Sequence, residues 1–319
     1  MLFEPARLHI PDGFLSPAVA AVGWILAALL IAVALRQTRQ QLRERQVPVM
    51  GVLAAFIFAA QAVNFPVAAG TSGHLIGGAL AAMVLGPWGG LLVMTAVVGV
   101  QALLFQDGGL IVMGWNIVNM GALATLSAYG AYRLTLRLVG EHRVGRLAAG
   151  FVGAWVSVEL GAVAAAVELA VSGTTSLALA LPAMVGVHAL IGLGEGIITV
   201  GALALLLTSR PGIVREAEAS PGRTASYLAI AGLLAAMAVA LASPLASSHP
   251  DGLNAVAETL GFAGRESTPG WAPLAGYQFP GLGPTATATI VAVTVGTLIV
   301  FGVAIVVGRG LRPRGPAAE

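Results

Sequence analysis

The residues best suited to chemistry are two of the chain's five histidines, His9 and His74. Each stands in a polar, glycine-containing segment beside a long apolar run. Neutral imidazole is a common ligand of nickel, cobalt, copper and zinc. The sequence contains no cysteine, so thiolate metal sites and disulfides are excluded. We predict that His9 and His74 bind a metal ion; the alternative is that both are solvated loop residues.

Two short polar side chains accompany these histidines. Asp12 stands three residues after His9, so its carboxylate could accept a hydrogen bond from an imidazole N–H. The alternative is that Asp12 only forms a turn, because Pro-Asp-Gly is an ordinary turn former. Ser72 precedes His74 by two positions and could support it in the same way. The string Gly-Thr-Ser-Gly around Ser72 also matches the serine of rhomboid-type intramembrane proteases. A serine protease that pairs Ser72 with His188 is therefore an alternative function.

A further pair of candidates lies inside a long apolar run. His188 and Glu195 are separated by about 700° of helical rotation, so they share one face of a helix. Ionisable side chains within a membrane are costly and face the protein interior. The pair could support the metal ligands or form a structural polar contact between helices.

Composition indicates that membrane-spanning helices hold these residues. The 319-residue chain is 57% hydrophobic and 9% charged, whereas soluble domains carry about 25% charged residues. Several apolar runs exceed the roughly 20 residues needed to cross a bilayer. We therefore predict an all-α polytopic membrane protein. All basic residues are arginine, and without lysine the chain has no standard phosphate loop. ATP-driven work would require another chain, and the chain itself is not expected to be an enzyme.

Nine apolar runs predict nine spans. They cover residues 18–35, 49–67, two short helices between 75 and 105, then 113–131, 147–171, 183–208, 227–242 and 289–307. Arginine clusters follow the first, fifth, seventh and ninth spans, and such clusters stay in the cytoplasm. This places the N-terminus outside and the C-terminus inside. His9, His74, the Gln-Asp-Gly-Gly turn at 106–109 and the long polar stretch 243–287 then share the extracytoplasmic face.

The composition divides the chain into two units. Residues 1–209 form a seven-span unit, 210–225 a cytoplasmic linker, and 226–319 a two-span unit with a large external loop. This loop carries His-Pro-Asp-Gly-Leu at 249–253, a near-copy of the segment around Asp12. The arrangement is typical of a fusion of two proteins.

Three separated strings make residues 8–208 resemble the CbiM/NikM family, the substrate-capture (S) components of cobalt and nickel energy-coupling-factor transporters. They are His-Ile-Pro-Asp-Gly-Phe-Leu-Ser-Pro at 9–17, Gly-His-Leu-Ile-Gly-Gly at 73–78 and His-Ala-Leu-Ile-Gly-Leu-Gly-Glu-Gly at 188–196. The second unit resembles the CbiN/NikN companion, or PDGLE domain, although Asn254 stands where that motif ends in Glu.

The resemblance implies a seven-helix S-component bundle plus two helices flanking an extracytoplasmic loop, in a bacterial or archaeal cell membrane. It implies capture of Ni(II) or Co(II) as transported substrate, with no permanent cofactor and no nucleic-acid partner. The expected partners are a transmembrane coupling (T) protein, cytoplasmic ATPase (A) subunits and membrane lipid. An ATP-independent metal permease is the remaining alternative.

The resemblance also implies a ligand set. In that family the chain's free α-amine, with the amide nitrogen and imidazole of the second residue, chelates the metal. A histidine matching His74 completes a square-planar site suited to Ni(II), Co(II) or Cu(II). Leu8 stands where the family has its initiating Met, after seven further residues. We therefore expect a mature chain that begins at residue 8, by initiation at a leucine codon or by trimming, so that Leu8 supplies the amine beside His9.

Overall fold

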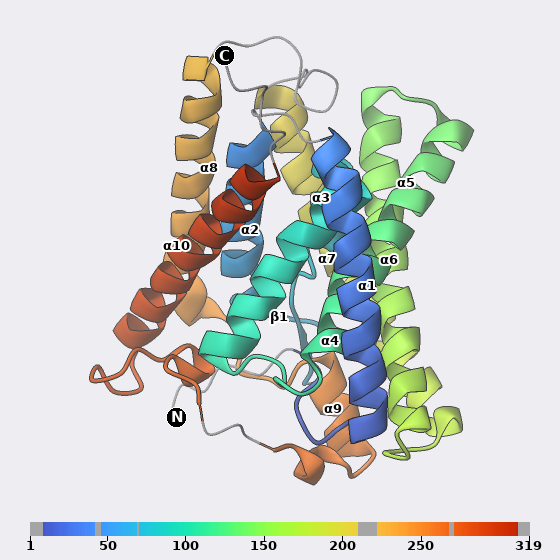
Figure 1. The fold of residues 1–319 in the computed structure, drawn as a ribbon. Coiled ribbons are helices and arrows are strands. Elements are labelled where there is room, and N and C mark those ends of the chain that lie inside the picture. The colour runs from blue at the N-terminus through green and yellow to red at the C-terminus, as the bar shows by residue number, and fades with distance from the viewer. Residues whose placement is uncertain (1–8, 42–45, 69, 210–221, 268–270, 312–319) are drawn as a thin grey trace, which may run out of the picture.

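The computed structural model describes residues 9–41, 46–68, 70–209, 222–267 and 271–311. Its long helices run up and down between two ends of a bundle (Figure 1). The helices are α1 (Pro17–Gln41), α2 (Gln46–Gln61), α3 (Gly78–Val100), α4 (Met113–Asn116), α5 (Ala124–Val139), α6 (Arg143–Val171), α7 (Leu177–Ser209), α8 (Gly222–Leu241), α9 (Gly252–Thr259) and α10 (Ala286–Gly310). The predicted all-α fold is confirmed.

Short irregular pieces complete the elements. Two π-helical segments, Gln101–Phe105 and Ile117–Leu123, extend α3 and join α4 to α5. The strands β1 (Phe65–Pro66) and β2 (Ser72–Gly73) pair antiparallel. Three 3₁₀ turns, Ser243–Leu245, Ala263–Arg265 and Ala275–Tyr277, lie in the C-terminal unit.

The helices are long and apolar enough for a multi-pass membrane protein. Within the described residues, five helical stretches could cross a bilayer by length and composition: Pro17–Gln40, Gly78–Phe105, Arg143–Val171, Leu177–Thr208 and Ala286–Gly310. The stretches Gln46–Gln61 and Ile230–Leu241 are apolar but shorter. The count of seven plus two spans stays a prediction.

The stretch Gly78–Phe105 is not one straight helix but two helical segments joined at Gly86. The backbone leaves the helical conformation there, with φ 76° and ψ 165°. A Cβ atom built on Gly90 would lie 2.9 Å from the main-chain nitrogen of Ala82. Residues eight apart in a straight helix are separated by about 12 Å, so the chain folds back at Gly86. This agrees with the two short helices predicted from the break at Pro87.

Several predicted boundaries were wrong. The second span was expected to reach residue 67, but α2 ends at Gln61. The following residues form β1, since Pro66 cannot continue a helix. The fifth span runs on to Val139 and the seventh begins already at Leu177. The polar stretch 243–287 is not a simple loop, because it contains α9.

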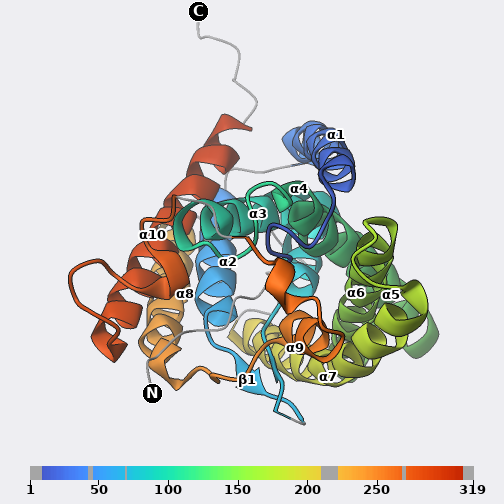
Figure 2. The same cartoon turned by 90° about the horizontal axis from the view of Figure 1, so that it is seen from below.

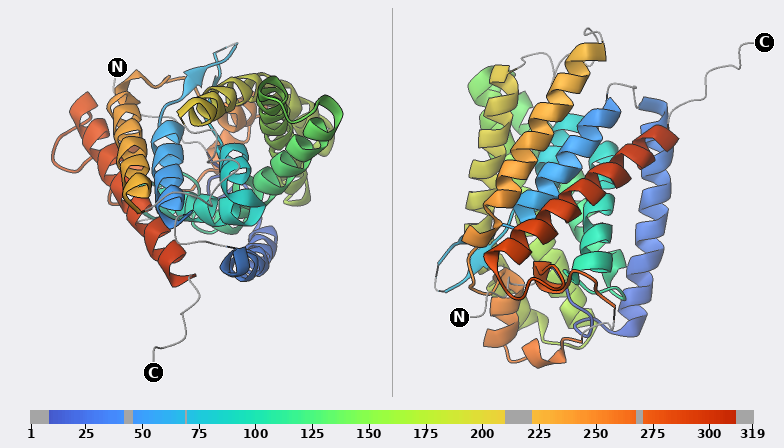
Figure 3. Two further views of the ribbon diagram at one scale, coloured as in Figure 1. Left: turned by 90° about the horizontal axis from the view of Figure 1, so that it is seen from above. Right: turned by 90° about the vertical axis from the view of Figure 1, so that its left-hand side faces the viewer.

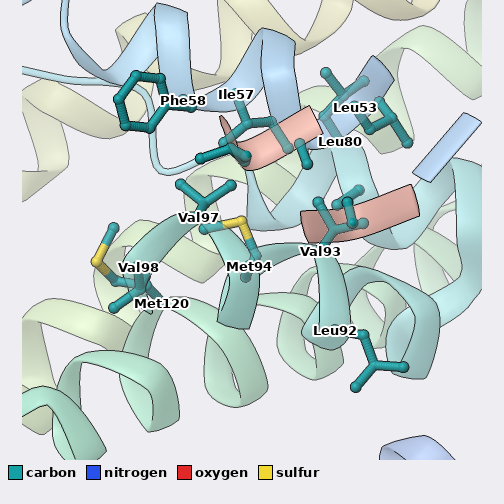
Figure 4. Packing of buried hydrophobic residues seen from close by; sticks show 14 of the residues in the cluster. Leu53, Ile57, Phe58, Leu80, Leu92, Val93, Met94, Val97, Val98 and Met120 are labelled. Atoms are coloured by element: carbon teal, nitrogen blue, oxygen red, sulfur yellow. The ribbon is translucent and has the colours of Figure 1, made fainter. Parts of the chain in front are cut away.

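The C-terminal helices pack onto the N-terminal bundle through α2, and α10 crosses obliquely beside α2 and α8 (Figure 3). Glycines allow the close approach: a Cβ at Gly232 would meet Val52 at 2.3 Å, and one at Gly296 would meet Phe58 at 2.3 Å. Small residues have this role at helix contacts in membranes. In the centre, Phe58 belongs to a buried cluster of side chains from α2, α3 and Met120 (Figure 4).

Near the lower end of the bundle, α9 lies beside α7 (Figure 2). Residues 9–15, apart from Gly13, are buried there, and the ring of Phe14 packs edge to face on Phe262 at 5.1 Å between centroids. A Cβ at Gly13 would lie 2.0 Å from the carbonyl oxygen of Arg265. The N-terminal segment is therefore enclosed by the C-terminal unit.

Candidate metal site

The two predicted metal ligands lie side by side. His9 precedes the turn into α1, and His74 follows β2. Their imidazole rings meet edge to face with centroids 5.5 Å apart. The side chain of His9 is 1% exposed and that of His74 is 11% exposed. This burial excludes the alternative that both are solvated loop residues.

Asp107 holds the ring of His9. Its main-chain carbonyl oxygen lies 3.1 Å from His9 Nδ1, and its Oδ1 lies 3.5 Å from the same nitrogen. Its Oδ2 accepts a hydrogen bond of 2.5 Å from the hydroxyl of Tyr277. His9 Nε2 is buried and has no hydrogen-bond partner among the described residues. This nitrogen is therefore the one left for a ligand from outside the protein.

Asp251 of the C-terminal unit faces His74. Its Oδ2 lies 4.0 Å from His74 Nε2, while its Oδ1 accepts the N–H of Asn254 and caps α9. Burial is the main cause that raises the pKa of the Asp251 carboxyl well above its usual value, and the charge of Asp107 adds to it. A cation beside Asp251 would favour its ionised form.

A short strand contact sets Asp251 opposite the His74 segment. Ser72 forms a parallel bridge with Asp251, and its N–H donates to the carbonyl of Pro250 at 2.8 Å. Its hydroxyl donates to the carbonyls of His249 at 2.8 Å and Pro250 at 3.3 Å. The hydroxyl of Ser72 thus donates to main-chain carbonyls of the C-terminal unit and not to the ring of a histidine.

Glu195 holds the main chain that follows His74. Its Oε2 accepts the N–H of Ile76 at 2.6 Å, and its Oε1 accepts the N–H of Gly77 at 2.9 Å. Bonds to an ionised acceptor are stronger than neutral ones. A fully buried carboxylate needs such partners. Glu195 therefore fixes the path of the loop that presents His74.

His188 shares a face of α7 with Glu195 but is not its partner. Its Nδ1 lies 2.7 Å from the carbonyl oxygen of Met184 in the same helix. A Cβ built on Gly252 would lie 3.1 Å from His188 Nε2, so α9 packs directly on this ring. The structure places His188 in the wall of the site, and Glu195, on the same face of α7, contacts the main chain after His74 instead of this ring.

Asp12 anchors the segment that follows Asp107. Its Oδ2 accepts the N–H of Leu110 at 3.0 Å, and its Oδ1 accepts those of Ile111 at 2.9 Å and Val112 at 3.1 Å. A Cβ at Gly109 would lie 2.1 Å from this Oδ1, so only glycine fits there. The carboxylate beside the His9 ring is Asp107, and Asp12 lies in a turn, which is the second of the two interpretations of its sequence.

A cavity of about 90 Å³ joins these side chains. Its lining includes His9, His74, His188 and Asp251. One water occupies about 10–15 Å³ of such volume, so a divalent cation with some of its water fits. Within the described residues, no group of three or more His, Asp or Glu is arranged to hold a metal ion. The two imidazoles therefore need further ligands, such as water or main-chain nitrogens. The prediction that Leu8 supplies an amine concerns a residue outside those that the structure describes.

Asp107, Asp251 and Tyr277 were not among the predicted site residues. The sequence did offer an indication for Asp107, because its Gln-Asp-Gly-Gly turn was expected on the same membrane face as both histidines. Asp251 stands in the near-copy of the segment around Asp12, which marked it as well. Tyr277 lies in an irregular stretch, and no pattern in the sequence singles it out.

Known proteins match the chain along most of its length. Residues 9–213 match the CbiM model, described as a cobalt uptake substrate-specific transmembrane region, and residues 226–313 match the PDGLE domain. A putative fused nickel transport protein NikMN of Archaeoglobus fulgidus is 35% identical over 96% of this chain and 99% of that protein. A cobalt transport protein CbiM of Sorangium cellulosum is 33% identical over 65% of this chain and 94% of its own.

A solved structure has the same fold. The crystal structure of a truncated transition metal transporter superposes with a TM-score of 0.56 at 33% identity. The match covers 64% of this chain and 100% of that one. The buried histidine pair thus lies within the matched CbiM region, and Asp251 and Tyr277 lie within the PDGLE domain. The chain belongs to the CbiM family of cobalt uptake substrate-specific transmembrane proteins, fused to a PDGLE domain.

Proposed function

We propose that this chain is the substrate-specific component of an ATP-driven energy-coupling-factor importer that captures Ni(II) or Co(II) on the extracytoplasmic side. One observation carries the proposal: His9 and His74 meet in a buried cavity with Asp107 and Asp251 behind them. Two imidazoles suit borderline divalent metals. The two acids offset the charge of the ion in a setting where charge is costly. The relatives named for cobalt and nickel transport support the same substrate class.

The arginine pattern supports the orientation. The end of α1, the connection between α5 and α6, and the end of α10 lie at one end of the bundle (Figure 1). Arg39, Arg137, Arg143 and Arg309 stand at these positions. By the positive-inside rule this end is cytoplasmic. The metal site, near α4 and α9 at the opposite end, is then extracytoplasmic.

ATP hydrolysis would belong to partner chains. The sequence contains no lysine for a phosphate loop. A transmembrane coupling protein and cytoplasmic ATPase subunits would therefore supply the energy. The C-terminal unit would enclose the captured ion, because it contributes Asp251 and packs α9 on His188.

The free amine proposed at Leu8 has a chemical consequence. A chelate through an amine at residue 8 and the amide of residue 9 would need His9 Nδ1, since only that nitrogen closes a six-membered ring. In the structure Asp107 occupies Nδ1. In a chain that begins at residue 8, His9 Nδ1 would leave Asp107 and bind the metal. In the longer chain, His9 would bind the metal through Nε2.

Metal accumulation in cells tests the importer. The chain is expressed in a host without nickel and cobalt transporters, with and without its coupling protein and ATPases, and ⁶³Ni or ⁵⁷Co uptake is measured. We expect uptake only with the ATPases, and its loss in His74→Ala. Equal uptake without the ATPases would identify an ATP-independent permease. Absence of uptake together with loss of a proteolytic activity in Ser72→Ala would identify a protease.

A further inference from the structure

A buried asparagine of the CbiM region pairs with the main chain beside His9. Asn116, the last residue of α4, is 2% exposed. Its Oδ1 accepts the N–H of Ile10 at 3.1 Å, and its Nδ2 donates to the carbonyl oxygen of the same residue at 3.0 Å. One side-chain amide thus satisfies both main-chain groups of Ile10, as the facing residue of a neighbouring strand does in an antiparallel sheet.

This pairing places the main chain directly after a predicted metal ligand. The N–H of Ile10 and the carbonyl of His9 belong to one planar peptide unit. A single main-chain rotation, the ψ angle of His9, therefore separates this unit from the amide nitrogen of His9. The chelate that the family resemblance implies uses both this amide nitrogen and the imidazole. Asn116 is thus in a position to decide where these two groups lie.

The turn before α4 closes around the pair of Asn116 and Ile10. The N–H of Gly109 donates a second hydrogen bond to the carbonyl oxygen of Ile10 at 2.9 Å. A Cβ built on Gly108 would lie 2.9 Å from Asn116 Nδ2 and 3.0 Å from the Cβ of His9. Gly108 also has a φ of 92°, which residues with a side chain rarely adopt. Glycine therefore lets this turn pack against both Asn116 and His9.

Two other helices hold the segment that carries Asn116. Gly114 of α4 lets α1 approach so closely that an added Cβ would meet the main-chain nitrogen of Trp24 at 2.4 Å. Asn119 follows in the π-helical segment, and its Nδ2 donates to Glu168 Oε2 of α6 at 3.0 Å. Segments of this kind are frequent at functional sites. Asn116 therefore presents its amide to Ile10 from a firm support.

Order in the segment around His9 affects how tightly an ion can bind. Fixing the backbone of a residue has an entropic cost, which metal binding would have to overcome if the segment were loose. Order that exists beforehand removes this cost from the binding step. Both bonds of the Asn116 amide are made to protein groups. They can therefore hold the segment before the ion arrives.

We propose that Asn116 is a positioning residue for metal capture: its pairing with Ile10 holds His9 in place for the incoming ion. The inference rests on the proposed function and deepens it. It assigns the order of the capture segment to a side chain whose amide is engaged by the main chain and not by the ion.

Nickel titration of the purified full-length chain tests this, with Ni(II) affinity and the visible d–d spectrum at saturation as readouts. Asn116→Ala removes both bonds to Ile10. Trp24→Phe is the matched control: it removes one bond between α1 and the segment before α4, from the indole N–H to the carbonyl of Ile111, at a residue that is 41% exposed. We expect Asn116→Ala to weaken Ni(II) binding about tenfold, the effect of ordering roughly one residue on binding, and to shift the d–d bands. Trp24→Phe should change neither.

Hydrogen exchange resolved to single amides, on metal-free wild-type protein, is the second measurement. The amide of Ile10 should be protected before Ni(II) is added, and Asn116→Ala should lose this protection. Exchange at Ile10 that becomes slow only with bound Ni(II) would overturn the inference, even if Asn116→Ala failed to fold.

Two results of the titration would also overturn it: a wild-type affinity and spectrum in folded Asn116→Ala, or an equal loss of affinity in Trp24→Phe. Wild-type protein that binds no Ni(II), although its Ile10 amide is protected, would instead overturn the proposed function on which the inference rests. The two failures are therefore distinguishable.

Discussion

His9 and His74, which belong to distant parts of the chain, meet edge to face with ring centroids 5.5 Å apart. Buried acids anchor the main chain near both histidines: Asp12 accepts N–H groups of the segment after Asp107, and Glu195 accepts those of the segment after His74. The histidine pair is thus set by the folded frame before any metal arrives. Such preorganisation lowers the cost of binding.

Replacing Asp251 by Asn should weaken metal binding about tenfold. Asn caps a helix as well as Asp does, so the start of α9 is kept and only the negative charge beside His74 is removed. Nickel titration by calorimetry measures the effect, and circular dichroism verifies the helix content. An affinity equal to that of the wild type would show that the Asp251 charge does not act on the ion.

Replacing Glu195 by Gln should loosen the His74 loop. The amide NH₂ would face a main-chain N–H of Ile76 or Gly77, so one of two charge-assisted bonds is lost. We expect a decrease of about 2 kcal/mol in stability and faster hydrogen exchange at residues 74–77. The exposed Glu258 in α9 provides the control, since Glu258→Gln should leave both unchanged. Wild-type exchange in Glu195→Gln would contradict the anchoring role.

Replacing Gly86 by Ala should destabilise the fold by about 2 kcal/mol. The backbone conformation at Gly86, φ 76° and ψ 165°, is almost exclusive to glycine. No atom lies within 4 Å of the added Cβ, so the cost is conformational rather than steric. Gly99 in α3 is the matched control, because its Cβ also meets nothing and its φ is not positive. Gly99→Ala should be neutral or stabilising, and thermal unfolding in detergent compares the two. Equal effects would refute the turn at Gly86.

Replacing Ser72 by Ala should remove one hydrogen bond, to the carbonyl of His249, and cost about 1 kcal/mol. We expect metal affinity within about fivefold of the wild type and no loss of any peptide-cleaving activity. Ser127→Ala removes a comparable hydroxyl bond inside α5 and serves as control. If Ser72→Ala abolished cleavage of a membrane substrate and Ser127→Ala did not, Ser72 would be a catalytic nucleophile instead.

The sequence was sufficient to predict the parts of the fold that depend on local composition. Long apolar runs predicted α6 and α10 closely, and the glycines and proline near Gly86 predicted the reversal inside α3. The presence of α9 was missed, because the bridge of Ser72 with Asp251 and the packing of α9 on α7 are long-range contacts. Hydropathy carries no information on such contacts.

For the metal site, the sequence indicated the candidate ligands better than it indicated the residues that contact them. His9 and His74 were found because imidazole in a polar segment of a membrane protein is conspicuous. For Asp12, however, the sequence left two interpretations open, support of the His9 ring or a turn, and in the structure Asp107 lies beside that ring. Tyr277 could not be predicted, since its role depends on where a 3₁₀ turn in the C-terminal unit meets the π-helical end of α3.

Metal binding by purified protein tests the central claim most directly. Chains that begin at residue 1 and at residue 8 are titrated with nickel and cobalt by calorimetry, each with and without His74→Ala. We predict that one ion binds per chain in the parent proteins and that His74→Ala abolishes or strongly weakens this binding. No bound metal in any version, or identical binding after His74→Ala, would contradict the assignment of His9 and His74 as the capture site.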